Sequence, residues 1–381
     1  MKRVLFLNEN PLPSQFSQGT ISGKELRLRS AIEEIDEVHV LARRGTSYVV
    51  KPGKANQTRT NLEKKIFVHY LPPWPYYFSS IGLFIWGWYW MWKLKPVVVE
   101  AESPLWSGPA VVILGKLFHV PSVVEIRASY IYLLKHRAKW IPEKIKIYLH
   151  DLIYWPVLKN ADAVIANSKY YKKQVAKRRI KAVEINPGIQ FPPKVNKSLE
   201  HKNTIGFIGR LVNEKGVDLL IQAFGLANKQ LKNKWKLEIV GNGPEKNMLQ
   251  NMTFHRGIAH LIEFYGVQDN YKSIARWSIL INTTTVAAPL EMVNAEAAYL
   301  GVPVVCFGDK YLPETVVDGV TGYKVPTQDV LSLADAIVNL TSNPKLRNKF
   351  GENGRTFAMT NYSVEDQVHK LKKLYRKLKI I

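Results

Sequence analysis

Two basic side chains follow a short apolar run in the second half of the chain. Residues 204–224, TIGFIGRLVNEKGVDLLIQAF, predict a strand at 204–208, a Gly-rich turn and then a helix. Arg210 and Lys215 lie beside that turn, and such a pair of cations can hold a pyrophosphate. Gly206 and Gly209 have no side chains, so we expect the backbone there to approach a ligand closely. This stretch therefore predicts a diphosphate site, although Lys215 as a solvated lysine is the alternative.

A second stretch, residues 284–325, predicts a loop, a helix at 291–300, a strand, a loop and a strand. Its helix carries Glu296 among small apolar residues, and a carboxylate there could accept two hydrogen bonds from the vicinal hydroxyls of a ribose. The start of the helix, near Met292 and Val293, offers free backbone N–H groups to an anion. The segment could thus hold both a sugar and a phosphate, unless Glu296 is an ordinary surface residue.

Five motifs support a family resemblance, namely GFIGRLVNEKGVDLLIQAF, LEIVGNGPEKNML, IEFYGV, NAEAAYLGVPVV and PETVVDGVTGYKV. In this order and spacing they resemble the donor half of the retaining GT-B glycosyltransferases of family 4, the group that contains bacterial mannosyl- and glucosyltransferases. The resemblance is strong over the last half of the chain and weak over the first half. It implies an α/β fold of the GT-B type, with two Rossmann-like domains whose parallel sheets face a central cleft, and a C-terminal helix that crosses back to the first domain.

The resemblance also implies roles for single residues. Arg210 and Lys215 would neutralise the donor diphosphate and stabilise the charge that builds on the leaving phosphate. The donor-binding residues it implies are Gly209 at the turn, Val267 at the nucleobase, the backbone of Met292 and Val293 at the phosphate, and Glu296 at the ribose. We expect no metal and no cofactor besides the nucleotide-diphosphate sugar, because no carboxylate cluster has metal-ligand spacing.

One position departs from the family pattern. The family usually has two glutamates separated by seven residues; Glu296 matches the second, and Ala288 stands at the first, which contacts the donor sugar. Glu291 would substitute if the loop follows a different path. Otherwise the donor sugar is bound differently or turnover is impaired.

The first half of the chain offers two further candidates. A strand at 4–7, a loop and a helix at 23–34 could place the backbone N–H of Gly23 on a phosphate, and an ordinary strand-to-helix turn is the alternative. Arg127 falls where many family members have a histidine that faces the donor sugar. It could act in catalysis by binding the donor phosphate or an acceptor anion, or it could be paired locally with Glu125.

The composition predicts an anionic partner. The formal net charge is +23 and the pI is about 9.8, which favours nucleic acid or an anionic membrane surface. No zinc-finger spacing or RNA-recognition pattern supports nucleic acid, so we do not expect it as a partner. The one cysteine, Cys306, lies in an apolar strand, which indicates a buried and inert thiol in a reducing compartment.

Residues 71–92, LPPWPYYFSSIGLFIWGWYWMW, contain no charge and five of the ten tryptophans. Three prolines break the first part, and tryptophan and tyrosine favour the lipid–water interface. We therefore expect a helix or loop lying in the membrane surface, with a buried helix of the first domain as the alternative. Residues 131–200 are strongly basic, which favours docking to anionic lipid.

We expect residues 1–193 to form an N-terminal Rossmann-like acceptor domain with a membrane-facing surface, residues 200–361 a C-terminal donor domain, and residues 362–381 the returning helix. The predicted function is transfer of a hexose from a nucleotide-diphosphate sugar to a glycan or lipid-linked acceptor at the inner face of the membrane, by a peripheral cytoplasmic enzyme. The alternatives are a soluble acceptor, a nucleotide-sugar or glycan-binding protein without turnover, and a nucleic-acid-binding module supported by charge alone.

Overall fold

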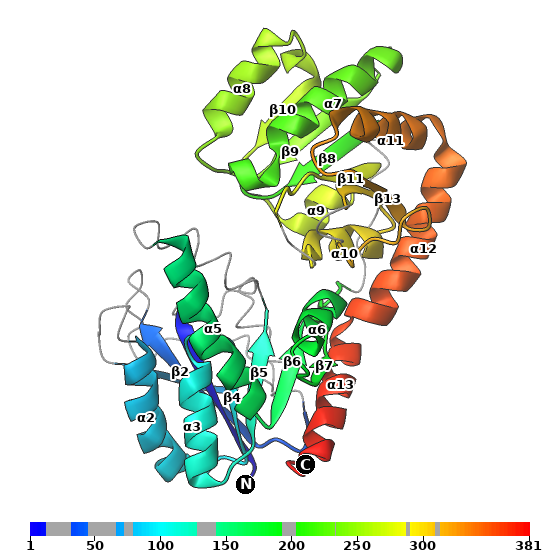
Figure 1. The fold of residues 1–381 in the computed structure, drawn as a ribbon. Coiled ribbons are helices and arrows are strands. Elements are labelled where there is room, and N and C mark those ends of the chain that lie inside the picture. The colour runs from blue at the N-terminus through cyan, green and yellow to red at the C-terminus, as the bar shows by residue number, and fades with distance from the viewer. Residues whose placement is uncertain are drawn as a thin grey trace, which may run out of the picture. The chain divides into compact units, whose positions relative to one another are not determined.

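The computed structural model describes residues 1–12, 32–44, 66–71, 79–127, 142–192, 203–232, 234–286, 290–308 and 313–381. The chain divides into two compact units. Unit 1 contains Met1–Gly188 together with Val364–Ile381, and unit 2 contains Ile189–Ser363. Each unit consists of a parallel sheet with helices on both faces (Figure 1).

Unit 1 has a seven-stranded sheet in the order β3-β2-β1-β4-β5-β6-β7. Every strand pair is parallel, as expected where helices connect the strands. The strands are β1 (Arg3–Leu12), β2 (Glu37–Arg44), β3 (Ile66–Tyr70), β4 (Val98–Ala101), β5 (Ser122–Ile126), β6 (Ala163–Ala166) and β7 (Ala182–Glu184).

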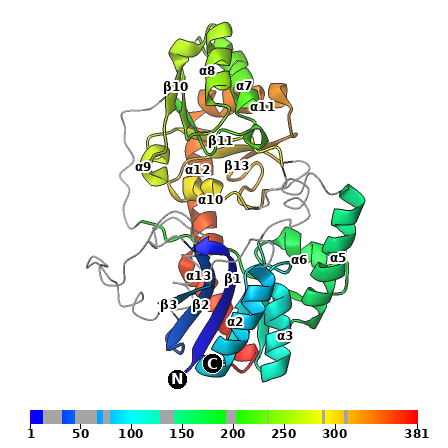
Figure 2. The ribbon, with the colours of Figure 1, turned by 90° about the vertical axis from the view of Figure 1, so that its left-hand side faces the viewer.

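The two faces of this sheet are covered by different helices. Leu5 and Leu7 point to the face that is covered by α2 (Ser79–Leu94), α3 (Gly108–Phe118), α5 (Glu143–Asn160) and α6 (Lys169–Ala176). Val4 and Phe6 point to the opposite face, which is covered by α13 (Val364–Lys377). Figure 2 shows α13 and the α2/α3 pair on opposite sides of the strands.

Helix α13 returns to the first unit, as predicted. Leu371, Leu374 and Tyr375 of this helix are buried in the core that also contains Val4 and Phe6. The Tyr375 hydroxyl donates a hydrogen bond to the Glu100 carboxylate in β4. The last helix of the chain therefore completes the core of unit 1.

Unit 2 has a six-stranded parallel sheet in the order β10-β9-β8-β11-β12-β13. Its strands are β8 (Thr204–Ile208), β9 (Lys236–Val240), β10 (Ile262–Tyr265), β11 (Ile279–Asn282), β12 (Val304–Phe307) and β13 (Gly322–Val325). Its α-helices are α7 (Val217–Gln230), α8 (Lys246–His255), α9 (Asn270–Ile274), α10 (Met292–Tyr299), α11 (Val330–Ser342) and α12 (Pro344–Tyr362). Both sheets have the strand order of a Rossmann fold, and this confirms the predicted fold class.

Gly206 has a different role from the predicted one. A Cβ atom at this position would lie 1.8 Å from Cδ2 of the Trp277 ring. Trp277 is fully buried, and its indole N–H donates a 2.8 Å hydrogen bond to Glu238. Gly206 therefore makes room for this indole ring, and the expectation that it lets the backbone approach a ligand is wrong.

Candidate functional site

The candidate site of unit 2 lies where the strand order reverses. Strands β8 and β11 are neighbours, but the chain leaves them in opposite directions along the sheet, and ligands of such sheets bind at the carboxyl ends of these strands. The turn after β8 contains the short 3-10 helix Asn213–Lys215, and Thr283, Thr284 and Thr285 follow β11. Polar residues from both sides of the reversal therefore meet at one edge.

The two loops are held together by side-chain and backbone hydrogen bonds. The Thr283 hydroxyl donates to the Lys215 carbonyl over 2.8 Å, and the Thr285 N–H donates to the Glu214 carbonyl over 2.9 Å. Gly216 has a φ of 57°, and a Cβ atom there would lie 2.5 Å from the Thr283 carbonyl oxygen. Only glycine therefore allows this approach, which fixes the position of Lys215.

The structure brings Lys215 and Glu291 together. The Lys215 ammonium lies 2.7 Å from the Glu291 carboxylate and 3.1 Å from the Thr284 hydroxyl. Their side chains are 22% and 15% exposed, so a ligand from solvent can reach the pair. The first N–H groups of α10, at Met292 and Val293, have no intrahelical partner because they start the helix. The side chain of the preceding Glu291 does not cap them. A cation, a carboxylate and two N–H donors thus lie at one place.

Beneath this pair lies a buried polar network that was not predicted from the sequence. Asn282 accepts a 2.7 Å hydrogen bond from Thr284 and donates a 2.9 Å hydrogen bond to Asn294, and Asn294 donates to Thr315 over 3.1 Å. The sequence feature that could have revealed this network is the polar run at residues 282–285, which begins at the last residue of β11. The network therefore supports the loop after β11, whose Thr284 contacts Lys215, and the start of α10, which follows Glu291.

A pocket of about 10 Å³ lies beside this network, with Asn282, Asn294, Glu291 and Cys306 among its lining residues. It has room for roughly one water molecule. Burial raises the pKa of the Cys306 thiol to about 12. The thiol therefore stays protonated, in agreement with the inert role predicted for it.

Glu296 is only 7% exposed, so it is not an ordinary surface residue. Its carboxylate accepts a 2.8 Å hydrogen bond from the Asn270 amide at the start of α9. Burial, followed by the negative charge of Glu296, raises the pKa of the neighbouring Tyr271 phenol, which therefore stays neutral. Such a buried carboxylate needs hydrogen-bond donors, which sugar hydroxyls can supply.

Two predicted residues, Arg210 and Val267, lie in exposed positions, and a third, Gly209, is half-buried. The Arg210 side chain, just after β8, is exposed and has no partner among the described residues. Val267, after β10, is 85% exposed. Gly209 donates its N–H to the Val240 carbonyl over 3.0 Å and borders the turn that follows β9. The structure thus places these residues at the ends of β8 and β10, and among the described residues the Lys215 ammonium pairs with Thr284 and Glu291 instead.

Arg127 of unit 1 has the local pairing that was the alternative to a ligand role. Its guanidinium donates to the Glu102 carboxylate and, over 2.7 Å, to the Glu125 carboxylate. The Arg127 side chain is 9% exposed. Two carboxylates therefore neutralise its charge inside unit 1. Gly23 and Ala288 lie outside the described residues.

In the parts of the chain that the structure describes, no three His, Cys, Asp or Glu side chains are grouped so that they could hold a metal ion. The donors at the site are instead one lysine, backbone N–H groups and amide side chains. This set fits an anionic, hydroxyl-bearing ligand.

Comparison with known proteins agrees with this arrangement. Residues 188–357 match the family model of glycosyl transferases group 1. An uncharacterized glycosyltransferase of Methanocaldococcus jannaschii is 27% identical over 249 residues, which cover 62% of this chain and 63% of that protein. The capsular polysaccharide biosynthesis glycosyltransferase CapM of Staphylococcus aureus is 25% identical over 78% of this chain and 81% of its own length.

The crystal structure of HepE from Anabaena, in complex with UDP and glucose, has the same fold. It superposes with a TM-score of 0.70 at 16% identity, over 99% of this chain and 100% of that chain. Both parallel sheets of the present chain therefore have counterparts in a known two-domain structure. Residues 188–357 form a domain of the glycosyl transferases group 1 family, in a chain that has the GT-B fold.

Proposed function

We propose that this protein is a retaining glycosyltransferase that moves a hexose from a nucleotide-diphosphate sugar to a glycan or lipid-linked acceptor at a membrane surface. The observation that carries the proposal is the Lys215–Glu291 pair beside the uncapped start of α10. It puts a cation for a diphosphate within 2.7 Å of a carboxylate for sugar hydroxyls.

In the proposed donor complex, the diphosphate lies between Lys215, Arg210 and the N–H groups of Met292 and Val293. Glu296 accepts hydrogen bonds from the ribose hydroxyls, and the exposed Val267 contacts the nucleobase. The UDP and glucose that are bound to the structurally similar HepE support a UDP-hexose as the first donor to test.

The chemistry follows from these charges. The bond between the sugar anomeric carbon and the phosphate oxygen breaks, and the acceptor oxygen bonds to the same face of that carbon. The acceptor proton passes to the leaving phosphate oxygen. Negative charge grows on that phosphate during the reaction, so fixed cations stabilise the transition state more than the ground state. This route needs neither a protein nucleophile nor a metal ion.

Glu291 would take the place of the carboxylate that Ala288 lacks. Its position 2.7 Å from Lys215 supports this, because the sugar next to a bound diphosphate would lie close to the same lysine. In the free protein, Glu291 also partly neutralises Lys215. Donor binding would then exchange this ion pair for contacts of Lys215 with phosphate and of Glu291 with sugar hydroxyls.

The proposal is tested by incubating the protein with UDP-, GDP- and ADP-hexoses in the presence of EDTA and measuring release of the nucleoside diphosphate. We expect slow hydrolysis of one donor in the absence of acceptor, with the sugar released in the donor's anomeric configuration. A Lys215→Ala variant should lose this reaction. Hydrolysis that takes place only in a parallel reaction without EDTA would contradict the metal-independent mechanism.

The absence of a carboxylate at position 288 favours one rival, a nucleotide-sugar-binding protein without turnover. That protein would bind a nucleotide at the same site but would release no nucleoside diphosphate from any donor. Binding without hydrolysis, in a protein that also fails to transfer sugar to lipid extracts, would favour this rival.

A further inference from the structure

Helix α2 exposes apolar side chains on the side that faces away from the sheet. Ile81, Ile85, Trp88 and Trp92 recur at helical spacing, and Trp92 is 68% exposed. Together with Trp86 and Tyr89 they form a surface whose only charged side chain is Lys93. An exposed apolar patch of this kind marks an interaction site.

The opposite side of α2 is already buried in unit 1. Leu83 and Met91 pack into the core beneath the helix, and a Cβ atom at Gly87 would lie 2.7 Å from Leu114 of α3. The helix is therefore fixed along the sheet. At 1.5 Å per residue it is roughly 24 Å long, less than the ~30 Å of a hydrocarbon core. Among the helices of the described residues, none is long and apolar enough to cross a membrane.

The neighbouring helices continue the same surface. On α3, Ile113 and Leu117 are exposed one turn apart, and the Phe118 ring contacts Trp88 with a centroid distance of 5.2 Å. On α5, one stripe of exposed apolar side chains comprises Ile145, Tyr148, Leu149 and Leu152, and Ile147 and Ile153 are exposed as well. Lys116 of α3 donates a 2.6 Å hydrogen bond to Asn160 of α5, which joins the two helices. We call the exposed sides of α2, α3 and α5 the three-helix face.

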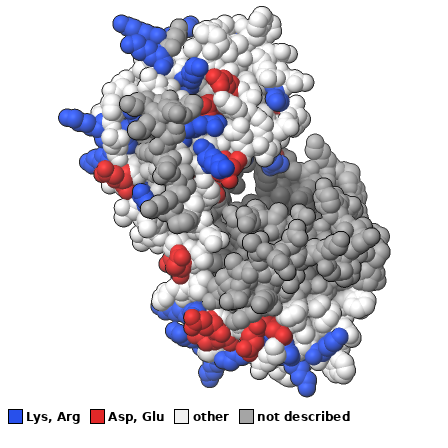
Figure 3. All heavy atoms as spheres, turned by 180° about the vertical axis from the view of Figure 1, so that it is seen from behind, with Lys and Arg blue, Asp and Glu red and all other residues white. Residues whose placement is uncertain are grey.

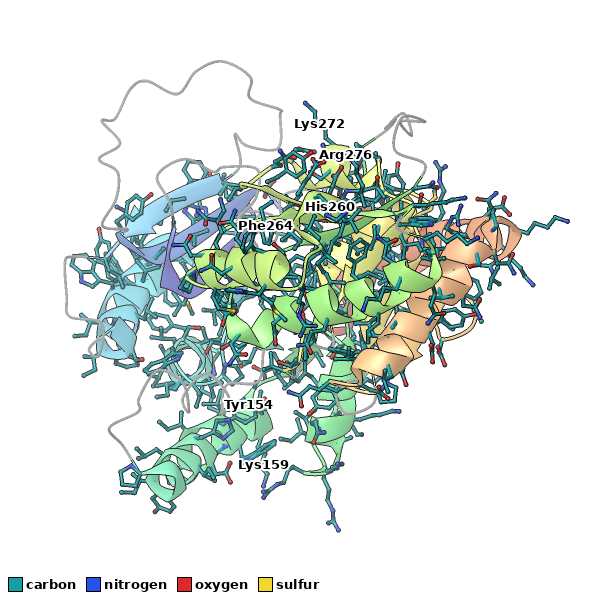
Figure 4. The ribbon with its side chains drawn as sticks, turned by 90° about the horizontal axis from the view of Figure 1, so that it is seen from above. Tyr154, Lys159, His260, Phe264, Lys272 and Arg276 are labelled. Carbon is teal, nitrogen blue, oxygen red and sulfur yellow. The ribbon has the colours of Figure 1, made fainter. Side chains whose placement is uncertain are left out.

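The charges on the three-helix face are mostly basic. Lys93, Lys116 and Lys159 are exposed, whereas Asp151 is the one acid among the described side chains of the three helices. Figure 4 labels Tyr154 and Lys159 on α5; Tyr154 is buried, and Lys159 is exposed at the last turn. The combination of aromatic residues and lysines suits the boundary of a bilayer with anionic headgroups.

The opposite side of unit 1 differs. There, acidic and basic side chains are interspersed on the side that bears α13 (Figure 3). Glu34 lies 3.4 Å from the Lys372 ammonium and 3.6 Å from the Arg376 guanidinium, and Asp366 lies 2.5 Å from Lys370. This is an ordinary water-facing surface that is itself rich in basic residues, so the exposed apolar side chains are what distinguish the three-helix face.

We propose that the three-helix face docks onto a bilayer that contains anionic lipid, with Trp88 and Trp92 at the level of the headgroups. The inference deepens the part of the proposed function that places the acceptor at a membrane. A second copy of the chain would fit this face less well, because each copy carries a net charge of +23 and the charged side chains described on the face are mostly basic.

The test is co-sedimentation with vesicles of phosphatidylcholine alone and of equal parts phosphatidylcholine and phosphatidylglycerol. We expect binding to the anionic vesicles, with a blue shift of the tryptophan emission. A Trp88→Glu/Trp92→Glu variant should bind the anionic vesicles roughly tenfold more weakly or worse. Leu117→Glu on α3 and Leu152→Glu on α5 should each weaken binding too, because they lie on the same face.

The matched control is Phe254→Glu, which replaces an equally exposed apolar residue on α8 of unit 2. It should bind vesicles as the wild type does. The proposal is wrong if the wild type stays in solution with anionic vesicles at low salt, or if the Trp88→Glu/Trp92→Glu variant binds them as well as the control does. It is also wrong if light scattering shows a dimer that the tryptophan substitutions make monomeric.

Nucleotide binding separates this result from the proposed function. The variants of the three-helix face should keep the thermal stabilisation by nucleotide that the wild type has, because they lie in unit 1 and Lys215 lies in unit 2. Loss of vesicle binding with unchanged nucleotide binding would confirm the docking surface. Vesicle binding without any stabilisation by nucleotide would support the docking surface and contradict the proposed donor site.

Discussion

At the scale of the residue, Lys215 is held ready for an anion by groups that approach it from two loops. Its carbonyl accepts the Thr283 hydrogen bond, and its ammonium contacts Thr284 and Glu291. A diphosphate bound as we propose would meet a cation whose position is already fixed, which would lower the entropic cost of binding. Glu291 moderates the charge of this cation until the ligand arrives.

Glu296 gives a prediction that separates its ribose contact from a structural role. A Glu296→Gln variant keeps the size of the side chain and can still accept from Asn270, but it loses the charge. Hydrogen bonds to charged groups contribute roughly 1.5–3 kcal/mol. We therefore expect the dissociation constant for the preferred nucleoside diphosphate to rise about tenfold to hundredfold, as measured by calorimetry.

The matched ligand for this prediction is the 2′,3′-dideoxy form of the same nucleotide. The wild type should bind it much more weakly than the ribose form, whereas Glu296→Gln, which keeps an acceptor but loses the charge, should discriminate much less between the two forms. A variant that still prefers the ribose form as strongly as the wild type does would show that Glu296 does not contact the ribose.

At the scale of the element, the contact between β8 and Trp277 predicts an unusually large effect of one methyl group. In a Gly206→Ala variant, the new Cβ atom would overlap the indole ring at 1.8 Å, and this ring is buried in the core. We expect unit 2 to lose about 3 kcal/mol of unfolding free energy or more in urea. Gly266→Ala is the control, because no atom lies within 4 Å of its added Cβ. Equal stabilities of the two variants would contradict this packing.

A second contact between elements, at His39 and His69, predicts a pH dependence in unit 1. Nδ1 of His39 lies 3.0 Å from Nε2 of His69, and the His69 ring stacks on Trp90 of α2 with a centroid distance of 3.6 Å. Burial, then His39 and Lys93, lowers the pKa of His69 to about 4. Burial also lowers the pKa of His39, which accepts or donates a 3.1 Å hydrogen bond with Glu37.

The sign of the effect follows from these pKa values. An unfolded histidine titrates near its ordinary pKa of about 6.5. Between that pH and about 4 the unfolded chain binds protons that the folded His69 does not, so stability is full above 6.5 and falls as the pH falls. The full shift corresponds to about 3 kcal/mol, and partial exposure reduces our expectation to roughly 1–2 kcal/mol.

A His69→Phe variant should therefore lose less stability than the wild type between about pH 7 and pH 5, as followed by urea unfolding of unit 1. The exposed His260 of unit 2, labelled in Figure 4, supplies the control variant His260→Gln. If the wild type and His69→Phe showed the same pH dependence, the loss of stability at low pH would not come from His69.

The elements also show what the sequence can predict. Strand β8 has its predicted bounds, because Thr204–Ile208 is a short, largely apolar run whose first four residues are buried. Helix α12 was not predicted, because Gly351 and Gly354 lower the helix propensity of this segment. In the structure Gly351 is essential to it, since a Cβ atom there would lie 2.3 Å from the Gly301 carbonyl next to α10.

The candidate site was predictable in part for a related reason. Residue types and motif order identified Lys215, Glu291 and Glu296, but the ion pair joins residues 76 positions apart. Its formation depends on the path of two loops and on the threonines that hold them, and no local pattern specifies such a path. The same holds for Arg127, because Glu102 reaches it from the end of a different strand.

At the scale of the whole molecule, the two units do not simply follow each other along the chain. Unit 1 contains both ends of the chain, and unit 2 is formed by the continuous stretch Ile189–Ser363. The proposed donor residues Lys215, Glu291 and Glu296 all belong to unit 2, whereas the three-helix face belongs to unit 1. Nucleotide binding and membrane docking can therefore be impaired separately, which makes each of them testable in the intact protein.

The most direct test of the donor site is thermal unfolding with UDP, GDP, ADP and CMP at millimolar concentration. The proteins compared are the wild type, Lys215→Ala, and Lys229→Ala as a solvent-exposed lysine control on α7. A nucleotide at a hundred times its dissociation constant stabilises the folded state by about 2.7 kcal/mol, which raises the melting temperature by roughly 5–10 °C. We predict such a shift with one nucleotide in the wild type and in Lys229→Ala, and its loss in Lys215→Ala. No shift with any nucleotide, or a shift that Lys215→Ala retains, would contradict the donor site.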